Sequence, residues 1–282
     1  MDINQVKKLI ERKKYDKKGD NGYCLIIGGS EDYPGAVTLA GLGALRAGCD
    51  SVTIASTNKV AWAINAYAPD LITKKVTTNN FNIKNAKDMV KLAENYDAIC
   101  LGNGITKKAD KFCQYFIKKS KKLKVIDADA LTTTKFKDHI NSILMPNHRE
   151  LEEMLINSDK KFILPKLMDK KPRELAKILQ GNLRYFLQNN NVLVVKGATD
   201  IIISKNKISY NKTGNPALAK AGTGDVLAGL AVGFLAKTKD LFKSAEAAVY
   251  INGLIGDNIQ KKNKSYTLIA SDIIEDLKKI KS

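Results

Sequence analysis

Asn211-Lys-Thr-Gly-Asn-Pro-Ala-Leu-Ala-Lys-Ala-Gly-Thr-Gly-Asp225 is the stretch that decides the fold, and it stands directly before the apolar run 226–236. Glycines allow backbone amides to approach a ligand closely, and a helix beginning at Thr223 would direct its unpaired N–H groups at a phosphate. Asp225 would then lie in the first turn of that helix. An acid beside an anion hole predicts phosphoryl transfer to a hydroxyl group whose proton the acid accepts. A short Gly-x-Gly-Asp alone would equally suit an ordinary capped turn, but the longer context favours the phosphate site.

Short apolar runs alternate with amphipathic stretches along the whole chain, a pattern typical of an α/β protein whose mostly parallel sheet has helices on both faces. The predicted strands are residues 24–29, 52–56, 98–102, 124–127, 142–145, 192–196, 201–204 and 207–210. The predicted helices are residues 35–47, 59–67, 107–118, 149–156, 173–190, 223–237, 242–261 and 267–280. The last two strands are joined through Lys205-Asn206, so we expect an antiparallel edge hairpin. Without a proline- or serine-rich linker, residues 1–282 are expected to form a single domain, with a loose surface excursion at 157–171.

Small and polar residues follow five of these strands at the carboxyl end, which is where open α/β sheets bind ligands. They are Gly28-Gly29-Ser30, Gly102-Asn103-Gly104, Asp127-Ala128-Asp129, Pro146-Asn147 and Lys196-Gly197. Because these ends meet at one edge of the sheet, the coincidence indicates one site. Within it, Asp127 and Asp129 have two interpretations: binding of magnesium through water, or capping of the helix that follows.

The net charge of +18 suggests a nucleic-acid partner at first, but the kind of basic residue argues against one. Only five of the 47 basic residues are arginine, and the lysines are spread along the whole chain. Nucleic-acid readers instead gather arginine and stacking aromatics on one face. We therefore expect a solvated lysine-rich surface and no nucleic-acid partner, although this charge can attract nucleotides by steering.

The lengths of the apolar runs, the N-terminus and the positions of cysteine and histidine bear on the compartment and on metal binding. No apolar run approaches the ~20 residues of a membrane helix, and the charged N-terminus is no signal peptide, so we expect a cytoplasmic protein without a membrane partner. The four cysteines are scattered singly, which favours small core residues over metal ligands. The two histidines, His139 and His148, are too far apart to predict a zinc site.

Six blocks occur in a recognisable order from residue 18 to the C-terminal helix. They are Ile27-Gly28-Gly29-Ser30 with Pro34-Gly35-Ala36; Ala44-Leu45-Arg46-Ala47-Gly48; Gly102-Asn103-Gly104; Asp127-Ala128-Asp129-Ala130-Leu131; Lys196-Gly197-Ala198; and 211–225, all preceded by Lys18-Gly19-Asp20-Asn21-Gly22. In this order they resemble the ADP/ATP-dependent NAD(P)H-hydrate dehydratase family of the ribokinase-like superfamily. The resemblance implies a ribokinase-like three-layer sandwich. It also implies an enzyme that returns the S epimer of hydrated NADH or NADPH (NADHX, NADPHX) to the working cofactor.

The resemblance also implies the reaction and the residues that perform it. The C6 hydroxyl of the nicotinamide ring is phosphorylated by ADP or ATP with Mg²⁺, and phosphate then leaves; Asp225 is the base. The implied sites are Lys196, Gly197, Ala198, Thr199, Asp200 and Gly224 for the nucleotide; Ala36, Gly104, Asn147 and Asp225 for the hydrated substrate; and Ala221, Gly222, Thr223 and Gly224 for the anion hole. Magnesium is expected to be held mainly by phosphates. These residues also have purely structural interpretations: Lys196 as a solvated lysine at a strand end, and Ala36 and Gly104 as small residues that allow close packing.

The sequence departs from the family pattern after the fifth predicted strand. The family has Pro-His-x-Gly-Glu, whereas this chain has Pro146-Asn147-His148-Arg149-Glu150. The resulting Asn-x-x-Glu is a pattern that small-molecule kinases of the superfamily use to organise magnesium and phosphate. An amide at Asn147 can still donate to a pyrophosphate or ribose, and His148 is expected on the surface at a helix start. Thr199 is followed by Asp200 where the family has an apolar residue.

Two other functions compete with the dehydratase. One is a ribokinase-like kinase that phosphorylates a vitamin-precursor alcohol and releases the product, which the Asn147-x-x-Glu150 pattern favours. The other is a basic binding protein without catalysis. For the dehydratase, the family implies a homotetramer. The chain leaves no room before Lys18 for the epimerase domain of some members, so a separate epimerase is expected.

Overall fold

The computed structural model describes residues 1–280, which form an α/β sandwich around a nine-stranded sheet. The strand order is β3-β2-β1-β4-β5-β6-β7-β8-β9, parallel as far as β7, with β8 and β9 added antiparallel. The strands are β1 (Tyr23–Ile27), β2 (Ser51–Thr57), β3 (Ile72–Val76), β4 (Ala98–Leu101), β5 (Leu123–Ile126), β6 (Ser142–Leu144), β7 (Val192–Val195), β8 (Asp200–Ile203) and β9 (Ile208–Asn211). The expected antiparallel edge hairpin is therefore confirmed.

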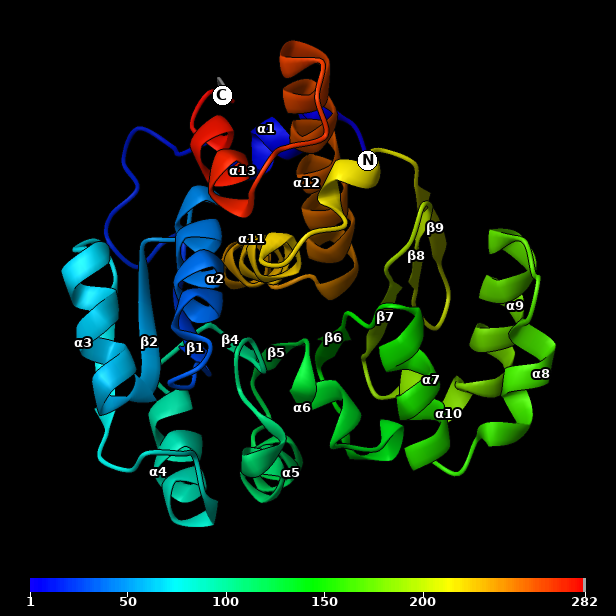
Figure 1. Cartoon of the computed structure of the whole chain (residues 1–282), viewed down its shortest axis with the longest axis horizontal. Coiled ribbons are helices and arrows are strands. Elements are labelled where there is room, and N and C mark those ends of the chain that lie inside the picture. The colour runs from blue at the N-terminus through cyan, green and yellow to red at the C-terminus, as the bar shows by residue number, and fades with distance from the viewer. Residues whose placement is uncertain (281–282) are drawn as a thin grey trace.

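Helices cover both faces of this sheet and complete three layers (Figure 1). One face carries α1 (Ile3–Ile10), α2 (Pro34–Arg46), α3 (Asn58–Tyr67), α11 (Thr223–Thr238), α12 (Leu241–Asn263) and α13 (Ala270–Leu277). The other carries α4 (Ile83–Ala93), α5 (Asp110–Lys119), α6 (Asp129–Thr132), α7 (His148–Asn157), α9 (Pro172–Asn182) and α10 (Arg184–Gln188), with the short α8 (Leu164–Leu167) beside α9. Along β1, Cys24 and Ile26 enter one core and Leu25 and Ile27 the other, so its apolar run is buried on both faces.

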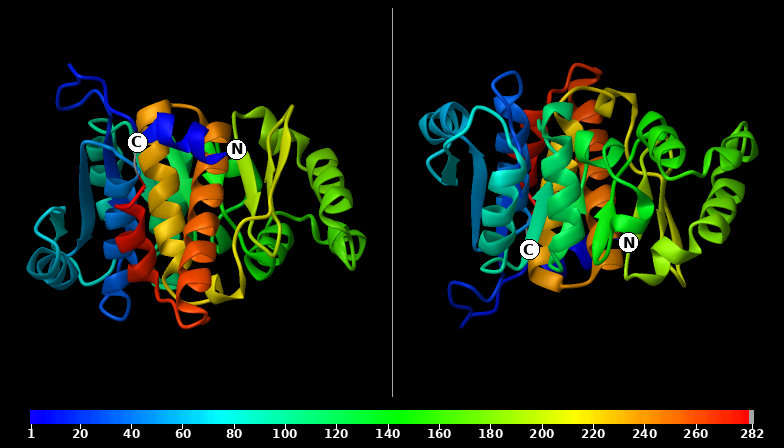
Figure 2. Two further views of the ribbon diagram at one scale, coloured as in Figure 1. Left: turned by 90° about the horizontal axis from the view of Figure 1, so that it is seen from above. Right: turned by 90° about the horizontal axis from the view of Figure 1, so that it is seen from below.

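Helix α11 is the central element of its layer, and glycines determine how closely it packs. A Cβ atom added to Gly229 would lie 2.1 Å from the backbone oxygen of Ala40, and one added to Gly233 would lie 2.6 Å from that of Ala44. Side chains at these positions would push α11 away from α2. Figure 2 shows α11 and α12 side by side over the same face. The helix that carries the glycine-rich segment is thus held between α2, α12 and the sheet.

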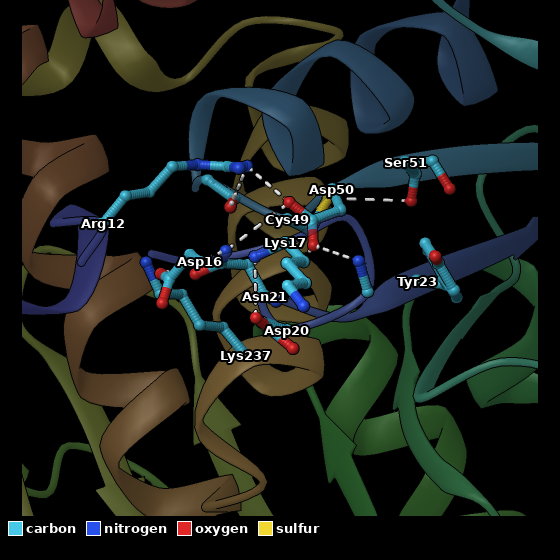
Figure 3. A network of polar contacts seen from close by, with 12 residues as sticks. Arg12, Asp16, Lys17, Asp20, Asn21, Tyr23, Cys49, Asp50, Ser51 and Lys237 are labelled. Atoms are coloured by element: carbon cyan, nitrogen blue, oxygen red, sulfur yellow. Dashed lines mark hydrogen bonds and ion pairs between the residues drawn. The ribbon is translucent and has the colours of Figure 1, made fainter. Parts of the chain in front are cut away.

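The N-terminal segment is fixed at the end of α11 that lies opposite Asp225 (Figure 3). Asp50 accepts hydrogen bonds from the backbone amides of Gly19 at 2.7 Å and Asn21 at 3.0 Å, and it pairs with Arg12 at 2.7 Å. Lys237, in the last turn of α11, donates to the backbone oxygens of residues 10 and 11. The block at residues 18–22 therefore has a structural explanation, since it forms the turn that Asp50 holds.

Several expectations about the elements need correction. The sequence reading missed α1, β3 and α4, and it took residues 173–190 as one helix where the structure has α9 and α10. Residues 157–171 include the 3₁₀ turn Lys161–Ile163 and α8. All four cysteines are buried thiols, as expected. None of the helices in residues 1–280 combines the length and apolar character needed to cross a bilayer. The single domain stays a prediction.

Candidate active site

The turns that follow β1, β4 and β5 meet at the carboxyl edge of the sheet, and glycines make this contact possible. A Cβ atom on Gly102, whose φ is +126°, would lie 1.9 Å from the backbone oxygen of Asp127. One on Gly28 would lie 2.3 Å from that of Asn103, and the Gly29 amide donates to the same oxygen at 2.9 Å. Only glycine allows these backbones to touch. The structure therefore brings three of the predicted strand ends together.

A chain of polar contacts runs from Asp225 across this edge. The Nδ2 atom of Asn103, itself fully buried, donates to Asp225 Oδ1 at 2.7 Å and lies 3.4 Å from Asp127 Oδ2. The ammonium of Lys196 contacts the other oxygen of Asp127 at 2.7 Å and lies 3.7 Å from Glu150 Oε2. Lys196 is therefore not a lysine extended into solvent, since two carboxylates hold it in the site.

These contacts set the charge states of the site. Burial raises the pKa of Asp225 to about 6; the hydrogen bond from Asn103 lowers this pKa, the charge of Asp127 raises it, and Lys196 lowers it. Burial disfavours the charge on Lys196, but the neighbouring Asp127 and Glu150 outweigh it and raise the lysine pKa above its ordinary value. A carboxyl group with a pKa near 6 is a base that is ionised at neutral pH yet still able to accept a proton.

Helix α11 begins at Thr223, as the sequence predicted, so the segment predicted as the anion hole lies at its N-terminus. Gly222 is the N-cap with φ +92°, a left-handed conformation that suits glycine. The Thr223 hydroxyl donates to the backbone oxygens of residues 218 and 220, which fixes the turn. A Cβ atom on Gly224 would lie 4.0 Å from Lys196 Nζ, so the lysine ammonium lies beside the helix N-terminus. Both features favour a bound phosphate.

A cavity of ≈ 670 Å³ adjoins this N-terminus. Its walls include seven of the residues predicted to bind ligands: Asn147, Lys196, Gly197, Ala198, Asp200, Thr223 and Gly224. The other predicted site residues do not line it: Ala36, Gly104, Thr199, Ala221, Gly222 and Asp225. Asp200 accepts from the Gly197 amide at 3.1 Å and from Asn211 Nδ2 at 3.0 Å, so its carboxylate shapes the loop that borders the cavity.

The glycine-rich segment is tied to α12 before it reaches the start of α11. Asn211 Nδ2 also donates to the backbone oxygen of Val249, and the Thr213 hydroxyl donates to that of Tyr250 at 2.9 Å. Asp257 accepts from the amide of Gly214 at 2.9 Å. These hydrogen bonds hold the segment, which lines the cavity, against α12.

The residues predicted for the hydrated substrate fall into two places. Gly104 has φ +66°, and a Cβ atom there would lie 2.9 Å from that of Ala36, so these two residues contact each other beside Asn103. Asn147 stands apart from them in the cavity wall, where its Oδ1 accepts from the Glu150 amide at 2.9 Å and Glu150 Oε2 accepts from the Asn147 amide at 2.8 Å. The Asn-x-x-Glu sequence thus forms the capping box of α7. His148 is exposed at the start of α7, as expected.

Sequence reasoning assigned no role to Asn103 and left open the role of Asp127. The capping interpretation is wrong for the helix after β5, because α6 has no side-chain cap and Asp127 instead contacts Lys196 and Asn103. The only signal for Asn103 was its position between two glycines at a strand end. Within residues 1–280 there is no cluster of three or more His, Cys, Asp or Glu side chains that could hold a metal ion.

Comparison with known proteins identifies the family. A family model described as NAD(P)H-hydrate dehydratase matches residues 24–279. The bifunctional NAD(P)H-hydrate repair enzyme of Methanocaldococcus jannaschii is 36% identical over 96% of this chain, and the chain spans about half its length (50%). The ADP-dependent (S)-NAD(P)H-hydrate dehydratase of Bacillus subtilis is 30% identical over 96% of this chain and 93% of its own.

A solved structure shows the same architecture. The ADP/ATP-dependent NAD(P)H-hydrate dehydratase of Bacillus subtilis, co-crystallised with ATP and Mg²⁺, superposes with a TM-score of 0.80 at 28% identity, covering 99% of this chain and 96% of its own. The ribokinase-like fold expected from the sequence is confirmed by this match. From the family match over residues 24–279 and these relatives, the chain belongs to the NAD(P)H-hydrate dehydratase family.

Proposed function

We propose that this protein dehydrates the S epimer of hydrated NADH or NADPH and consumes ADP or ATP in doing so. The observation that carries the proposal is the position of Asp225, a carboxyl group with a pKa of about 6, in the first turn of α11 beside the anion hole. The names of the relatives agree with this chemistry. Hydroxide is a poor leaving group, so the reaction needs the phosphate that the anion hole is built to receive.

The phosphoryl transfer has a residue for each role. Asp225 accepts the proton of the C6 hydroxyl while that oxygen attacks the terminal phosphorus of the nucleotide, and the bond between phosphorus and the leaving nucleotide breaks. The backbone amides of Ala221 to Gly224 stabilise the charge on the transferring phosphoryl group, and Lys196 adds a fixed positive charge. Phosphate then leaves C6 with the electron pair of the C–O bond while the lone pair of the ring nitrogen forms a C6=N bond, and loss of a proton from C5 to water then gives the C5=C6 double bond of the reduced nicotinamide.

The nucleotide and the hydrated substrate take different sides of Asp225 in this proposal. The nucleotide occupies the cavity, in contact with residues 196–200 and Gly224. The hydrated nicotinamide approaches from the side of Ala36 and Gly104, which pack closely against each other next to Asn103. Asn147 contributes its amide nitrogen, since Oδ1 is engaged in the capping box.

Magnesium fits this site as a companion of the phosphates. Asp127 and Glu150 supply hard carboxylate oxygens of the kind that Mg²⁺ accepts, and Lys196 contacts both. With no cluster of three ligands in residues 1–280, most of its ligands would come from the nucleotide and from water. The ion would neutralise charge on the phosphates.

The Asn147-x-x-Glu150 pattern favours one alternative, a ribokinase-like kinase that phosphorylates a vitamin-precursor alcohol, and Glu150 of this pattern lies 3.7 Å from Lys196. Its product would be a stable phosphate ester, whereas the dehydratase produces inorganic phosphate and absorbance at 340 nm. Incubation of the protein with hydrated NADH, Mg²⁺ and either ADP or ATP separates the two. Recovery of the NADH band that requires nucleotide supports the dehydratase and names its phosphate donor. No recovery with either nucleotide, from folded protein, would contradict it.

The proposal also covers the compartment, the oligomeric state and the partner enzyme. We infer a cytoplasmic enzyme that works as a homotetramer and receives the S epimer from a separate epimerase. Its lysine-rich surface, with a net charge of +18, attracts anionic nucleotides and dinucleotides and needs no nucleic-acid partner.

A further inference from the structure

The side-chain amide of Asn103 can support the base only in one orientation. Its Nδ2 atom donates to Asp225 at 2.7 Å and lies 3.4 Å from Asp127, so the nitrogen lies between two carboxylates. An amide turned by 180° would present Oδ1 to these oxygens, and acceptors would then face acceptors. A group that fixes the Asn103 amide therefore also fixes the direction of Asp225.

The thiol of Cys100 is placed to do this. Within residues 1–280, it is the only group that donates to Asn103 Oδ1, at 3.1 Å. Both side chains are fully buried, so bulk solvent does not reach the contact. Cys100 lies on β4 with its side chain in the core beneath α11, and the chain turns at Gly102, where φ is +126°, before it reaches Asn103. The contact is therefore built by the end of the strand and the turn that follows it.

The surroundings of Cys100 keep its sulfur protonated. Burial raises the pKa of the thiol well above its ordinary value, and the charges of Asp127 and Asp225 raise this pKa further. Cys100 is thus a donor at neutral pH and not a thiolate. A thiol is a weak donor, but a buried carbonyl oxygen without any donor is unfavourable. The thiol consequently stabilises the orientation in which Asn103 Oδ1 faces the sulfur and Nδ2 faces the carboxylates.

We propose that Cys100 is a positioning residue of the reaction, whose thiol holds the Asn103 amide in the orientation that directs Asp225. The inference rests on the proposed function, because it takes Asp225 to be the base. Neither Cys100 nor Asn103 lines the cavity assigned to the nucleotide. The effect of the thiol should therefore appear in kcat and not in the KM for the nucleotide.

Two substitutions of Cys100 separate hydrogen bonding from packing. Cys100→Ala and Cys100→Ser leave side chains of nearly equal volume, and only the second keeps a donor. Rates are measured with hydrated NADH, Mg²⁺ and the nucleotide that supports the reaction. In Cys100→Ala, kcat should fall roughly three- to tenfold, the usual effect of one lost hydrogen bond. In Cys100→Ser, kcat should stay within about twofold of the wild type, and the KM for the nucleotide should change in neither variant.

Cys24→Ala is the matched control for the loss of a buried thiol. Cys24 is fully buried in the same core, and its sulfur donates to the backbone oxygen of Val232 at 3.6 Å. This variant should lower the unfolding temperature much as Cys100→Ala does, because both leave a small cavity. Its kcat should stay that of the wild type.

A double-mutant cycle with Asn103→Ala tests whether the effect passes through the amide. In the Asn103→Ala background, Cys100→Ala should slow the reaction by less than about twofold, because the group that the thiol holds is already absent. Equal losses in both backgrounds, a wild-type kcat in Cys100→Ala, or a Cys100→Ser variant as slow as Cys100→Ala would each overturn the inference. The wild type would still recover NADH in those cases, so the proposed function would stand. No recovery of NADH by the wild type would overturn the proposed function and this inference with it.

Discussion

Asn103 Nδ2 donates a hydrogen bond to Asp225 Oδ1 at 2.7 Å, across 122 residues of sequence. The amide is fully buried, and the thiol of Cys100 lies 3.1 Å from its Oδ1, so the nitrogen faces the carboxylate. The bond fixes the direction of the base and lowers its pKa against the effect of burial. Asn103 is therefore a positioning residue that connects the turn after β4 to the start of α11.

Replacement of Asn103 by alanine should raise the pKa of Asp225 above its wild-type value of about 6, because the hydrogen bond that lowers it is lost. The acid limb of the pH profile of kcat/KM should move to higher pH, and the rate at pH 7 should fall roughly tenfold or more. Asn191→Ala is the matched control. Asn191 is a buried amide that bonds to the backbone at His139 and Phe186. A loss of stability alone would leave the limb in place, as in the control, and would refute the positioning role.

The pH dependence of the wild type follows from the same carboxyl group. Asp225 must be ionised to accept a proton, and burial raises its pKa to about 6. We expect kcat/KM to be constant above that pH and to fall about tenfold per pH unit below it. Initial rates between pH 5 and 8 measure the profile. A limb near the ordinary aspartate value of ~4 would show that Asp225 is not the base.

The charge on Asp225 should destabilise the folded protein. Its folded pKa of about 6 exceeds the unfolded value of ~3.9, so the folded state binds the proton more tightly and the free energy of unfolding falls as pH rises from 4 to 6. Asp225→Asn should therefore be more stable than the wild type by roughly 1–3 kcal/mol at pH 8, with a smaller difference near pH 4. Urea unfolding at both pH values measures this.

Asp50→Asn is the control for that experiment, because it should change the free energy of unfolding in the opposite direction. Although burial opposes its charge, the amides of Asn21 and Gly19 and the guanidinium of Arg12 hold the Asp50 pKa below its ordinary value. The ionised Asp50 carboxylate therefore stabilises the folded protein above the pKa of the unfolded state. This stabilisation is lost as the pH falls through the pKa of the folded state. Asp50→Asn should be less stable than the wild type at pH 8. If both variants shifted stability in the same direction, the electrostatic account of Asp225 would be wrong.

Alanine substitutions at two helix glycines, Gly229 and Gly181, separate the effect of close helix packing from that of helix propensity. At Gly229 a Cβ atom would lie 2.1 Å from the Ala40 oxygen, so Gly229→Ala should force α11 and α2 apart and lower stability by roughly 1–3 kcal/mol. At Gly181 in α9, no heavy atom counted among residues 1–280 lies within 4 Å of the added carbon. Gly181→Ala should raise stability by about 0.5–1 kcal/mol. Thermal unfolding of both would reject this account if Gly229→Ala proved neutral.

The sequence predicted the sheet, the edge hairpin and the start of α11, because apolar runs and glycine turns are local signals. It missed β3 because Lys74 and Lys75 interrupt the apolar alternation of a partly exposed edge strand. It missed the role of Asn103 for a different reason. That role depends on contacts with Asp127 and Asp225, which lie 24 and 122 residues away and meet Asn103 only when the ends of β4 and β5 converge with the start of α11.

The Asn147-x-x-Glu150 sequence shows how one pattern can have two physical origins. It suggested a kinase-like arrangement for magnesium, and in the structure it forms the capping box of α7. Glu150 nevertheless lies 3.7 Å from Lys196, so the cap also places a carboxylate beside the cavity. A local sequence pattern cannot predict this second contact, because Glu150 follows β6 and Lys196 follows β7, and the two come together only when these strands are neighbours in the sheet.

The central claim is that Asp225 removes the hydroxyl proton as phosphate is transferred. Its most direct test follows NADH at 340 nm and inorganic phosphate together, from hydrated NADH, Mg²⁺ and the nucleotide that supports the reaction, in the wild type and in Asp225→Asn. The wild type should release one phosphate per NADH. The variant should be slower by roughly two to four orders of magnitude, with nucleotide binding nearly unchanged. NADH formed without phosphate, or a variant as fast as the wild type, would contradict the claim.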